Sequence, residues 1–357
     1  MQKHLKIIFI QSYPIYHDHI DTSQWLRLEH RDKWMPAIAA EMGHEVEIWA
    51  VSTYDLESTY HWNKDTIVTI RLFKADHTPP RSKHHYSTAM VKHALEHPAD
   101  YYIIKGLDGG AGIFMIDQFL KKSGKPFAFI IGGKCQSHYL HLAHTVFYES
   151  DRQIPQIMDP YWTLRGRKRC EAHLIKLPKS VDLHHFSPMS TIDKTFDLVS
   201  VGRLIPYYKR YEDLFTLSEY LNVSFVGGGP LLEQNKRIWP DVHWYGTIQN
   251  AHVPMMLNTA RAFFYPSKRD FFPRVIAEAA SCGLPILCFE DSISEDVVPE
   301  HIGLRLRSKN YQDSLLSLIR DDDKLSEMGI EARRYALAHF GKDSTRVALE
   351  EFVSRLV

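Results

Sequence analysis

Short β-branched and aromatic runs alternate with longer amphipathic segments along almost the whole chain, which predicts alternating strands and helices. In the first half the strand-like runs are KIIFIQS, HEVEIWAVS, IVTIRLF, DYYIIKG, PFAFIIGG and AHLIKLP. In the second half they are FDLVSVGR, VSFVGGG, VHWYGTI, RAFFYPS, LPILCF and GLRLR. Helical patterns such as AGIFMIDQFLKKSG, closed by Gly124, lie between several of them. This order predicts an α/β protein whose parallel sheets are covered on both faces.

The number of predicted strands indicates two domains, since a chain of 357 residues is long for one core. About six predicted strands lie on each side of the segment DLHHFSPMSTIDKT. We predict two doubly wound, Rossmann-like domains that face each other across a cleft, residues 1–185 and 186–340, with a last helix at about 341–357 packing back on the first. Ligands of such sheets bind beyond the carboxyl ends of the strands, so the turns after strands should carry the chemistry.

Composition narrows the class of protein. Hydrophobic residues make up 44%, charged residues 24%, and the net charge is zero, so no overall field attracts nucleic acid. The apolar run near the start, KIIFI, is too short for a signal peptide, and no stretch approaches the roughly 18 apolar residues of a membrane span. The four cysteines are scattered and are expected to be reduced thiols. These features predict a cytoplasmic protein.

Four strand-to-helix turns of the second half carry candidate chemistry: VGRLIPYYKR, FVGGGPLLEQ, WYGTIQN and YPSKRDFFPRVIAEAA. Glycines allow backbone N–H groups to approach a ligand, and Pro230 is expected at the first position of a helix. Arg203 and Lys209 could neutralise a diphosphate without a metal ion. Together these turns predict a site for a nucleotide diphosphate.

Each turn also has a plainer interpretation. Gly227 to Gly229 could form an ordinary turn before a helix, and Arg203 and Lys209 could be solvated surface cations. Glu278 follows Arg274 by four residues, so the two could form a surface ion pair of about 0.3–0.5 kcal/mol. The occurrence of all four turns in order within one predicted domain favours the ligand site.

With these four turns, the second half resembles the donor-binding domain of retaining glycosyltransferases of the GT-B fold, family 4. The matching motifs are Gly202-Arg203-Leu204 with Lys209, Val226 to Pro230, Gly246-Thr247-Ile248, and Pro266-Ser267 followed by Asp270 and Glu278. The segments LPKSVDLHHFSP, AEAASCGLPILC and MGIEARRYALAHF match as well. The likeness is specific over residues 175 to 345 and loose before them.

The resemblance implies roles for these residues. Glu278 would accept hydrogen bonds from the ribose and Asp270 from the transferred sugar, while Arg203 and Lys209 would stabilise the leaving diphosphate. A helix starting near Pro273 would direct its N–H groups at the donor. The implied donor site comprises Gly202, Arg203, Lys209, Gly227, Gly228, Gly246, Thr247, Ile248, Asp270, Phe271, Phe272, Pro273, Arg274, Val275 and Glu278.

The chain departs from the family pattern at three places. Asp270 stands where glutamate is usual, and Lys209 comes one residue later than usual, which makes Arg210 an alternative. A histidine is often found after the strand that here reads FAFIIGG, but two glycines occupy that turn. His138 follows them and is our candidate for a group near the reacting carbon. Its i,i+3 spacing with His141 and His144 is typical of a packed or solvated helix face, which is the plainer interpretation.

The implied function is a retaining, metal-independent hexosyltransferase, with no cofactor and no metal ligand. We favour UDP-glucose or a similar UDP-hexose as donor and a glycan or lipid-linked acceptor, in polysaccharide or cell-envelope synthesis. Peripheral contact with the inner face of a membrane stays open. So do two alternatives, a catalytically inactive nucleotide-sugar-binding partner protein and a nucleotide-sugar epimerase of the same fold.

Other function classes fit the residues less well. A nicotinamide-dependent dehydrogenase needs Gly-x-Gly-x-x-Gly, but Leu232 stands at the last glycine of GGGPLL, and GGKCQS lacks the residues of a P-loop. The Asp-x-Asp within DDDK lies on a late helical segment, where a solvated turn is expected. The histidines of the first half have no recognised metal-ligand spacing. The loop after the first strand, and Asp108 in LDGG, are expected to shape the acceptor site.

Overall fold

The computed structural model describes residues 4–18, 20–27, 31–76, 81–133, 135–158, 169–206, 209–268 and 270–356. The chain forms two compact units: unit 1 contains residues 1–177 and 345–357, and unit 2 contains residues 178–344. The boundary after residue 177 precedes the one expected after residue 185. The segment between them is held by unit 2, because Val181 donates to the Phe340 carbonyl at 2.8 Å and Arg333 donates to the Leu183 and Phe186 carbonyls.

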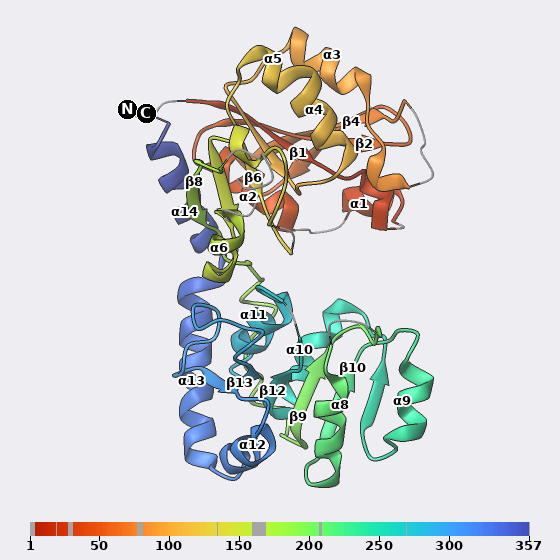
Figure 1. The fold of residues 1–357 in the computed structure, drawn as a ribbon, viewed down its shortest axis with the longest axis vertical. Helices are drawn as coiled ribbons and strands as arrows, with labels where there is room; N and C mark the ends of the chain where they lie inside the picture. Colours follow the sequence, from red (N-terminus) through yellow and green to blue (C-terminus); the bar gives the residue numbers. More distant parts are fainter. Residues whose placement is uncertain are drawn as a thin grey trace. The chain divides into compact units, whose positions relative to one another are not determined.

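Unit 1 is built on an eight-stranded sheet in the order β3-β4-β2-β1-β5-β6-β7-β8. Figure 1 labels β1, β2, β4, β6 and β8 of this sheet. All neighbouring strands are parallel except β3, which pairs antiparallel with β4. The pattern along the sequence does not predict β3 and β7. The strands are β1 (Lys6–Gln11), β2 (Glu45–Ser52), β3 (Leu56–His61), β4 (Ile67–Lys74), β5 (Tyr101–Lys105), β6 (Phe127–Ile130), β7 (Thr145–Tyr148) and β8 (His173–Lys176).

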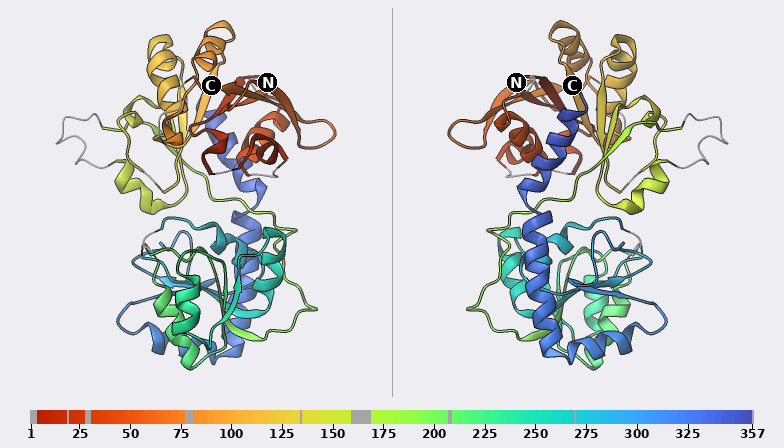
Figure 2. Two further views of the ribbon diagram at one scale, coloured as in Figure 1. Left: turned by 90° about the vertical axis from the view of Figure 1, so that its right-hand side faces the viewer. Right: turned by 90° about the vertical axis from the view of Figure 1, so that its left-hand side faces the viewer.

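Helices cover the sheet of unit 1, and the last helix of the chain belongs to its core. Leu349, Phe352 and Val353 of α14 pack with Ile7 of β1 and other strand residues, and the Phe352 ring lies 4.7 Å from the Tyr101 ring. The helices, which Figure 2 shows from two further sides, are α1 (Thr22–Arg27), α2 (Arg31–Glu41), α3 (Thr88–Glu96), α4 (Gly110–Met115), α5 (Lys121–Ser123), α6 (Ile154–Ile157) and α14 (Lys342–Ser354).

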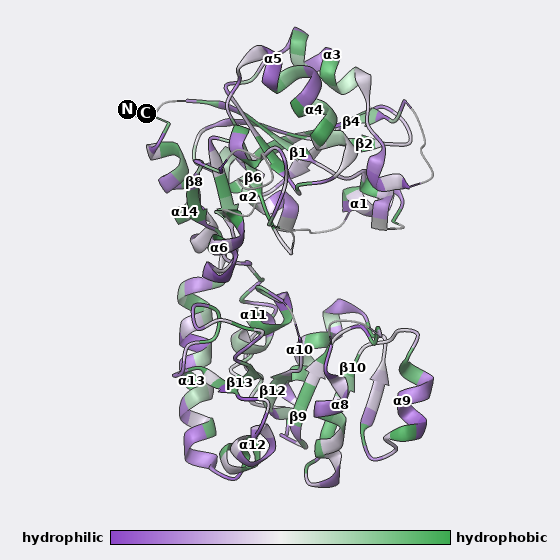
Figure 3. Cartoon of the chain, viewed as in Figure 1, coloured by the Kyte–Doolittle hydropathy of each residue, from purple (hydrophilic) through white to green (hydrophobic). Residues whose placement is uncertain are grey.

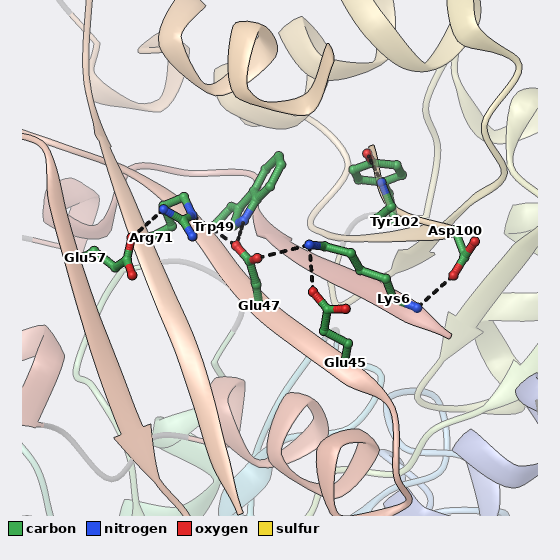
Figure 4. Close-up of polar contacts among 9 residues, drawn as sticks. Lys6, Glu45, Glu47, Trp49, Glu57, Arg71, Asp100 and Tyr102 are labelled. Atoms are coloured by element: carbon green, nitrogen blue, oxygen red, sulfur yellow. Dashed lines mark hydrogen bonds and ion pairs between the residues drawn. The ribbon is translucent and has the colours of Figure 1, made fainter. Parts of the chain in front are cut away.

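A network of charged residues lies on the sheet of unit 1, near the start of β1 and β2 (Figure 4). The buried Glu47 accepts from Trp49 Nε1 at 2.8 Å and from Arg71 Nε at 3.0 Å, and Lys6 Nζ lies 3.5 Å from its other oxygen. Burial would raise the pKa of Glu47, but these hydrogen bonds and the two positive charges together lower it. The network therefore keeps a buried carboxylate ionised.

Unit 2 is built on a fully parallel six-stranded sheet in the order β11-β10-β9-β12-β13-β14. Its strands are β9 (Phe196–Val201), β10 (Val223–Val226), β11 (His243–Gly246), β12 (Ala260–Tyr265), β13 (Ile286–Phe289) and β14 (Gly303–Leu306). Its helices are α8 (Tyr211–Phe215), α9 (Leu232–Ile238), α10 (Val253–Asn258), α11 (Arg274–Ser281), α12 (Tyr311–Ile319) and α13 (Asp322–His339).

The hydropathy pattern agrees with this layering. In Figure 3 hydrophilic and hydrophobic bands alternate along α13, as expected for a helix with one face on a core. One prediction about a helix start was wrong: Pro230 lies in a turn before α9, which begins at Leu232, so it is not the first helical residue. No helix of the described residues is long and apolar enough to cross a membrane.

Candidate active site in unit 2

The order of strands in unit 2 places a topological switch point between β9 and β12. From β9 the chain continues outward to β10 and β11, and from β12 it continues to β13 and β14 on the other side. The turns after β9 and β12 therefore diverge at the carboxyl edge of the sheet, which is where ligands of open α/β sheets bind. Both turns carry predicted site residues: Gly202 and Arg203 follow β9, and Asp270 follows β12.

Three glycine turns pack against one another along this edge. Gly227 donates to the Gly246 carbonyl at 2.8 Å, and Leu204 donates to the Gly228 carbonyl at 2.9 Å. A Cβ atom on Gly227, whose φ is +139°, would lie 1.8 Å from the Gly202 carbonyl oxygen, so no side chain fits there. The turns after β9, β10 and β11 therefore pack closely against one another.

Gly228 faces a side chain of the neighbouring turn, whereas Gly227 faces backbone. A Cβ atom on Gly228 would lie 2.3 Å from the Thr247 hydroxyl oxygen, which belongs to the turn after β11. Thr247 is exposed and Ile248 is half-buried, so the predicted residues of this turn border the same surface. Arg203 is also exposed, and its side chain makes no hydrogen bond or ion pair with any residue that the structure describes.

The segments that follow β9 and β12 are joined across the switch point. Lys209 and Ser267 form an isolated antiparallel bridge, and Arg210 N donates to the Pro266 carbonyl at 3.0 Å. This bridge places Lys209 beside Asp270, and the distance between Lys209 Nζ and Asp270 Oδ2 is 3.7 Å. Burial lowers the pKa of Lys209, and this effect exceeds that of the Asp270 carboxylate, which raises the pKa.

Arg210, the alternative to Lys209, has a different environment. Its guanidinium lies 3.7 Å from the centre of the Phe289 ring, is paired with Asp213, and donates to the Ser308 hydroxyl at 2.8 Å. These contacts fasten the start of α8 to the sheet. The geometry therefore favours Lys209 over Arg210 as the cation of the site.

Helix α11 begins where the resemblance implied. Pro273 is its N-cap, and a proline side chain has no atom that could accept from the first N–H groups of the helix. The N–H groups of such a helix end attract anions, through the unpaired donors and the helix dipole. Phe271 and Phe272 are buried, and the Phe272 ring lies 5.2 Å from the Phe340 ring, so it is their backbone that can face a ligand.

The two predicted acids, Asp270 and Glu278, differ in burial. Glu278 is 7% exposed on α11, so its carboxylate is not the solvated surface group that the plainer interpretation requires. Asp270 is more open, and its Oδ1 accepts from Phe271 N at 2.9 Å. Its Oδ2 accepts from the hydroxyl of Tyr265 at 2.7 Å.

Tyr265 is a site residue that the sequence pattern does not reveal. It is the last residue of β12 and 3% exposed, so the run RAFFYPS marks it only as part of a strand. Its hydroxyl also accepts from Lys209, whose Nζ lies 4.1 Å from the centre of the ring. Burial, with the nearby Asp270 charge, raises the pKa of Tyr265, so the hydroxyl keeps its proton.

His138 belongs to unit 1 and is exposed in a turn after β6. The expected helix face of three histidines is not formed, because residues 140–142 make a single 3-10 turn. His144 instead lies before β7, where its Nδ1 is 3.0 Å from the Tyr101 hydroxyl. In the described part of the chain, no group of three or more His, Cys, Asp or Glu side chains gathers in a way that could hold a metal ion.

Comparisons with known proteins agree with this geometry. Residues 184–335 match the family model "Glycosyl transferases group 1". Among curated protein sequences none matches the chain. The matching family model and the fold of the chain together support an enzyme of the glycosyltransferase class.

The fold is that of GT-B glycosyltransferases, as the similarity to solved structures shows. The chain is similar to sucrose-phosphate synthase from Thermosynechococcus elongatus, with 15% identity, a TM-score of 0.71, and 99% of each chain covered. It is similar to HepE from Anabaena in complex with UDP, with 14% identity and a TM-score of 0.67, over 98% of this chain and 100% of that one. A glycosyltransferase from Rickettsia africae has 10% identity and a TM-score of 0.70, over 99% and 98%.

Proposed function

We propose that the protein is a retaining, metal-independent glycosyltransferase that moves a hexose from a UDP-hexose, with UDP-glucose favoured, to a glycan or lipid-linked acceptor. The observation that carries this proposal is the edge of the unit 2 sheet. There, the glycine turns, Lys209 and the start of α11 surround one switch point. HepE, solved with UDP and with UDP-glucose, shares the fold and supports a uridine nucleotide.

In the proposed reaction, the developing charge of the leaving diphosphate is met by protein cations. Arg203 and Lys209 supply these charges, and the start of α11 adds N–H donors, so the chemistry assigned to a metal ion in other transferases is provided by the chain. Glu278 takes the ribose hydroxyls and Asp270 the hydroxyls of the transferred sugar. A carboxylate suits both tasks, because its oxygens can accept two hydroxyl donors at once.

A ligand screen tests the donor site first. Unfolding midpoints are measured with UDP-, GDP- and ADP-sugars in EDTA, because a ligand that binds the native state raises the midpoint by mass action. We expect stabilisation by UDP-hexoses without added metal. Stabilisation only in the presence of Mg²⁺ or Mn²⁺ would contradict the proposal.

Identification of the product then separates the proposal from its alternatives. An α-linked product from the α-linked donor, seen by NMR, is the expected result, and a β-linked product would contradict retention. Binding without transfer or hydrolysis would identify an inactive partner protein. Conversion of the donor to a second UDP-hexose without any acceptor would identify an epimerase.

The residue from unit 1 is tested separately. His138→Ala is expected to lower kcat/KM for transfer if this histidine acts near the reacting carbon. An unchanged kcat/KM would remove His138 from the mechanism and direct attention to Asp108, which accepts a hydrogen bond from the Tyr13 hydroxyl.

A further inference from the structure

The hydroxyl of Tyr265 lies between the two charged side chains of the site. It accepts from Lys209 Nζ and donates to Asp270 Oδ2 at 2.7 Å, and the buried side chain of Ser267 is a further hydrogen-bond partner. A phenol has a single proton, and an ammonium group can only donate, so the direction of both bonds is fixed. The order is therefore Lys209 to Tyr265 to Asp270.

This arrangement sets the orientation of both charged groups. Among the described residues, Oδ1 of Asp270 accepts from Phe271 N and Oδ2 accepts from Tyr265, with Lys209 Nζ 3.7 Å from Oδ2. A carboxylate oxygen can accept more than one hydrogen bond. The side chain of Asp270 is 31% exposed, so this capacity is available to a ligand. Lys209 gives one of its three ammonium protons to Tyr265 and keeps others for an anion.

We propose that Tyr265 is a positioning residue that joins the cation of the diphosphate site to the carboxylate that reads the transferred sugar. The inference rests on the proposed function and deepens it. Aspartate is one methylene shorter than the glutamate of the family pattern, and the Tyr265 hydroxyl fixes the direction in which this shorter side chain points.

We expect removal of the Tyr265 hydroxyl to weaken recognition of the sugar. Tyr265→Phe keeps the ring beneath Lys209 and its packing against Phe263, whose ring centre lies 6.5 Å away. Without the hydroxyl, Oδ2 of Asp270 loses a donor and the Lys209 ammonium can turn directly toward it. Sugar recognition should therefore suffer more than nucleotide recognition.

The matched control is Tyr211→Phe. Tyr211 is also a buried tyrosine, 7% exposed, and its hydroxyl has no hydrogen-bond partner among the described residues. Its ring packs in the core of unit 2 against Phe215 and Phe225. The two variants remove the same atom from similar depth, but only one of them breaks the link between Lys209 and Asp270.

The first measurement compares kinetics and binding. We expect Tyr265→Phe to lower kcat for transfer from UDP-glucose about tenfold, or ~1.4 kcal/mol, while its affinity for free UDP stays within about threefold of wild type. It should also discriminate less between UDP-glucose and UDP-galactose. Tyr211→Phe should stay close to wild type in kcat, in affinity for free UDP and in discrimination between the two donors. If Tyr265→Phe behaves like Tyr211→Phe, the proposal is wrong.

The second measurement needs no substrate, so it separates failure of this inference from failure of the proposed function. The unfolding midpoints of Tyr265→Phe, Asp270→Asn and the double variant are compared in a double-mutant cycle. We expect the double variant to lose less than the sum of the single losses, because both changes break one link. Strictly additive losses would overturn the link, whether or not wild type transfers a sugar.

Discussion

The two sheets of the molecule have similar connections at their switch points but use the carboxyl edge differently. In unit 1 the switch point lies between β1 and β5, and Ser12, just after β1, binds the start of α4. Its Oγ accepts from Gly109 N at 3.1 Å and its carbonyl accepts from Ala111 N at 3.2 Å. In unit 2 the corresponding helix, α11, has Pro273 as its N-cap, a residue whose side chain has no hydrogen-bond acceptor.

Gly109 of unit 1 and Gly228 of unit 2 differ in the atoms that an added side chain would meet. A Cβ atom on Gly109 would lie 2.1 Å from the Ser12 carbonyl oxygen, so this glycine allows two backbone segments of unit 1 to pack. In unit 2, Gly228 is half-buried beside the exposed Thr247. A doubly wound sheet therefore does not by itself create an anion site. In unit 1 the start of α4 is bound by Ser12, whereas the anion site that we propose for unit 2 lies at the start of α11.

The largest expected effect is the loss of a cation from the unit 2 edge. Lys209→Ala and Arg203→Ala should each lower kcat on the order of 10²-fold or more, the range for a removed transition-state donor. Steady-state kinetics at saturating donor measures this. Arg210→Ala is the control and should weaken stability more than turnover, because Arg210 is held by Asp213 and Phe289. If Lys209→Ala keeps normal kcat and Arg210→Ala loses kcat, then Arg210 and not Lys209 is the cation of the diphosphate site.

The two acids of unit 2 should fail in different ways. Glu278→Ala should weaken both free UDP and UDP-hexose by roughly 1.5–3 kcal/mol, as expected for hydrogen bonds to a charged group. Asp270→Asn should leave free UDP affinity nearly unchanged while lowering transfer. Calorimetric titration of UDP and UDP-hexose into both variants tests this. An equal loss of free UDP affinity in the two variants would refute the assignment of one acid to ribose and the other to sugar.

Paired glycine substitutions examine the difference between the two edges directly. Gly109→Ala should destabilise the protein by about 1–3 kcal/mol, because the added methyl meets backbone that cannot move. Gly228→Ala should cost less stability, since the Thr247 hydroxyl can rotate away, but should weaken UDP binding. Denaturant unfolding and UDP titration of both variants give the four numbers needed. If Gly109→Ala folds with normal stability but binds UDP weakly, the edge of unit 1 and not that of unit 2 would be the UDP site.

The smallest expected effect is on acid stability, in unit 1. The pKa of Glu47 is lowered in the folded state from its ordinary value of 4.5. Its contribution to stability is therefore present above that value and is lost as the pH falls through the folded pKa. Glu47→Gln should therefore be less stable than wild type at pH 7, with the difference shrinking as the pH drops below 4.5. Glu57→Gln, which removes the charge of the exposed partner of Arg71, is the control. A pH-independent difference for Glu47→Gln would contradict this.

Much of the fold follows from the hydrophobic pattern of the chain. All six strands of unit 2 are predicted, because buried parallel strands are short continuous apolar runs bounded by glycine or polar turns. β3 escapes prediction because its sequence, LESTYH, is mostly polar on an edge strand with one buried residue. β7, TVFY, is only four residues long and follows histidines whose spacing suggests a helix.

The site could be predicted only in part. Glycine turns and charged residues are visible in sequence because few residue types can serve at those positions, and Lys209 with Asp270 do meet in unit 2. Tyr265 escapes notice because an aromatic residue at a strand end is ordinarily core. The choice between Lys209 and Arg210 depends on Phe289 and Ser308, about 80 and 98 residues away in the chain, and a local pattern contains no information about such contacts.

The most direct test of the proposed donor site is a titration of UDP, in EDTA, into wild type and Arg203→Ala. Arg203 lies on the open edge of unit 2, and its side chain makes no hydrogen bond or ion pair within the described chain, so its removal should leave the fold intact. We predict metal-free binding to wild type and at least about tenfold weaker binding to the variant, or ~1.4 kcal/mol. Equal affinity of the two proteins, or binding that requires a divalent cation, would contradict the proposed site.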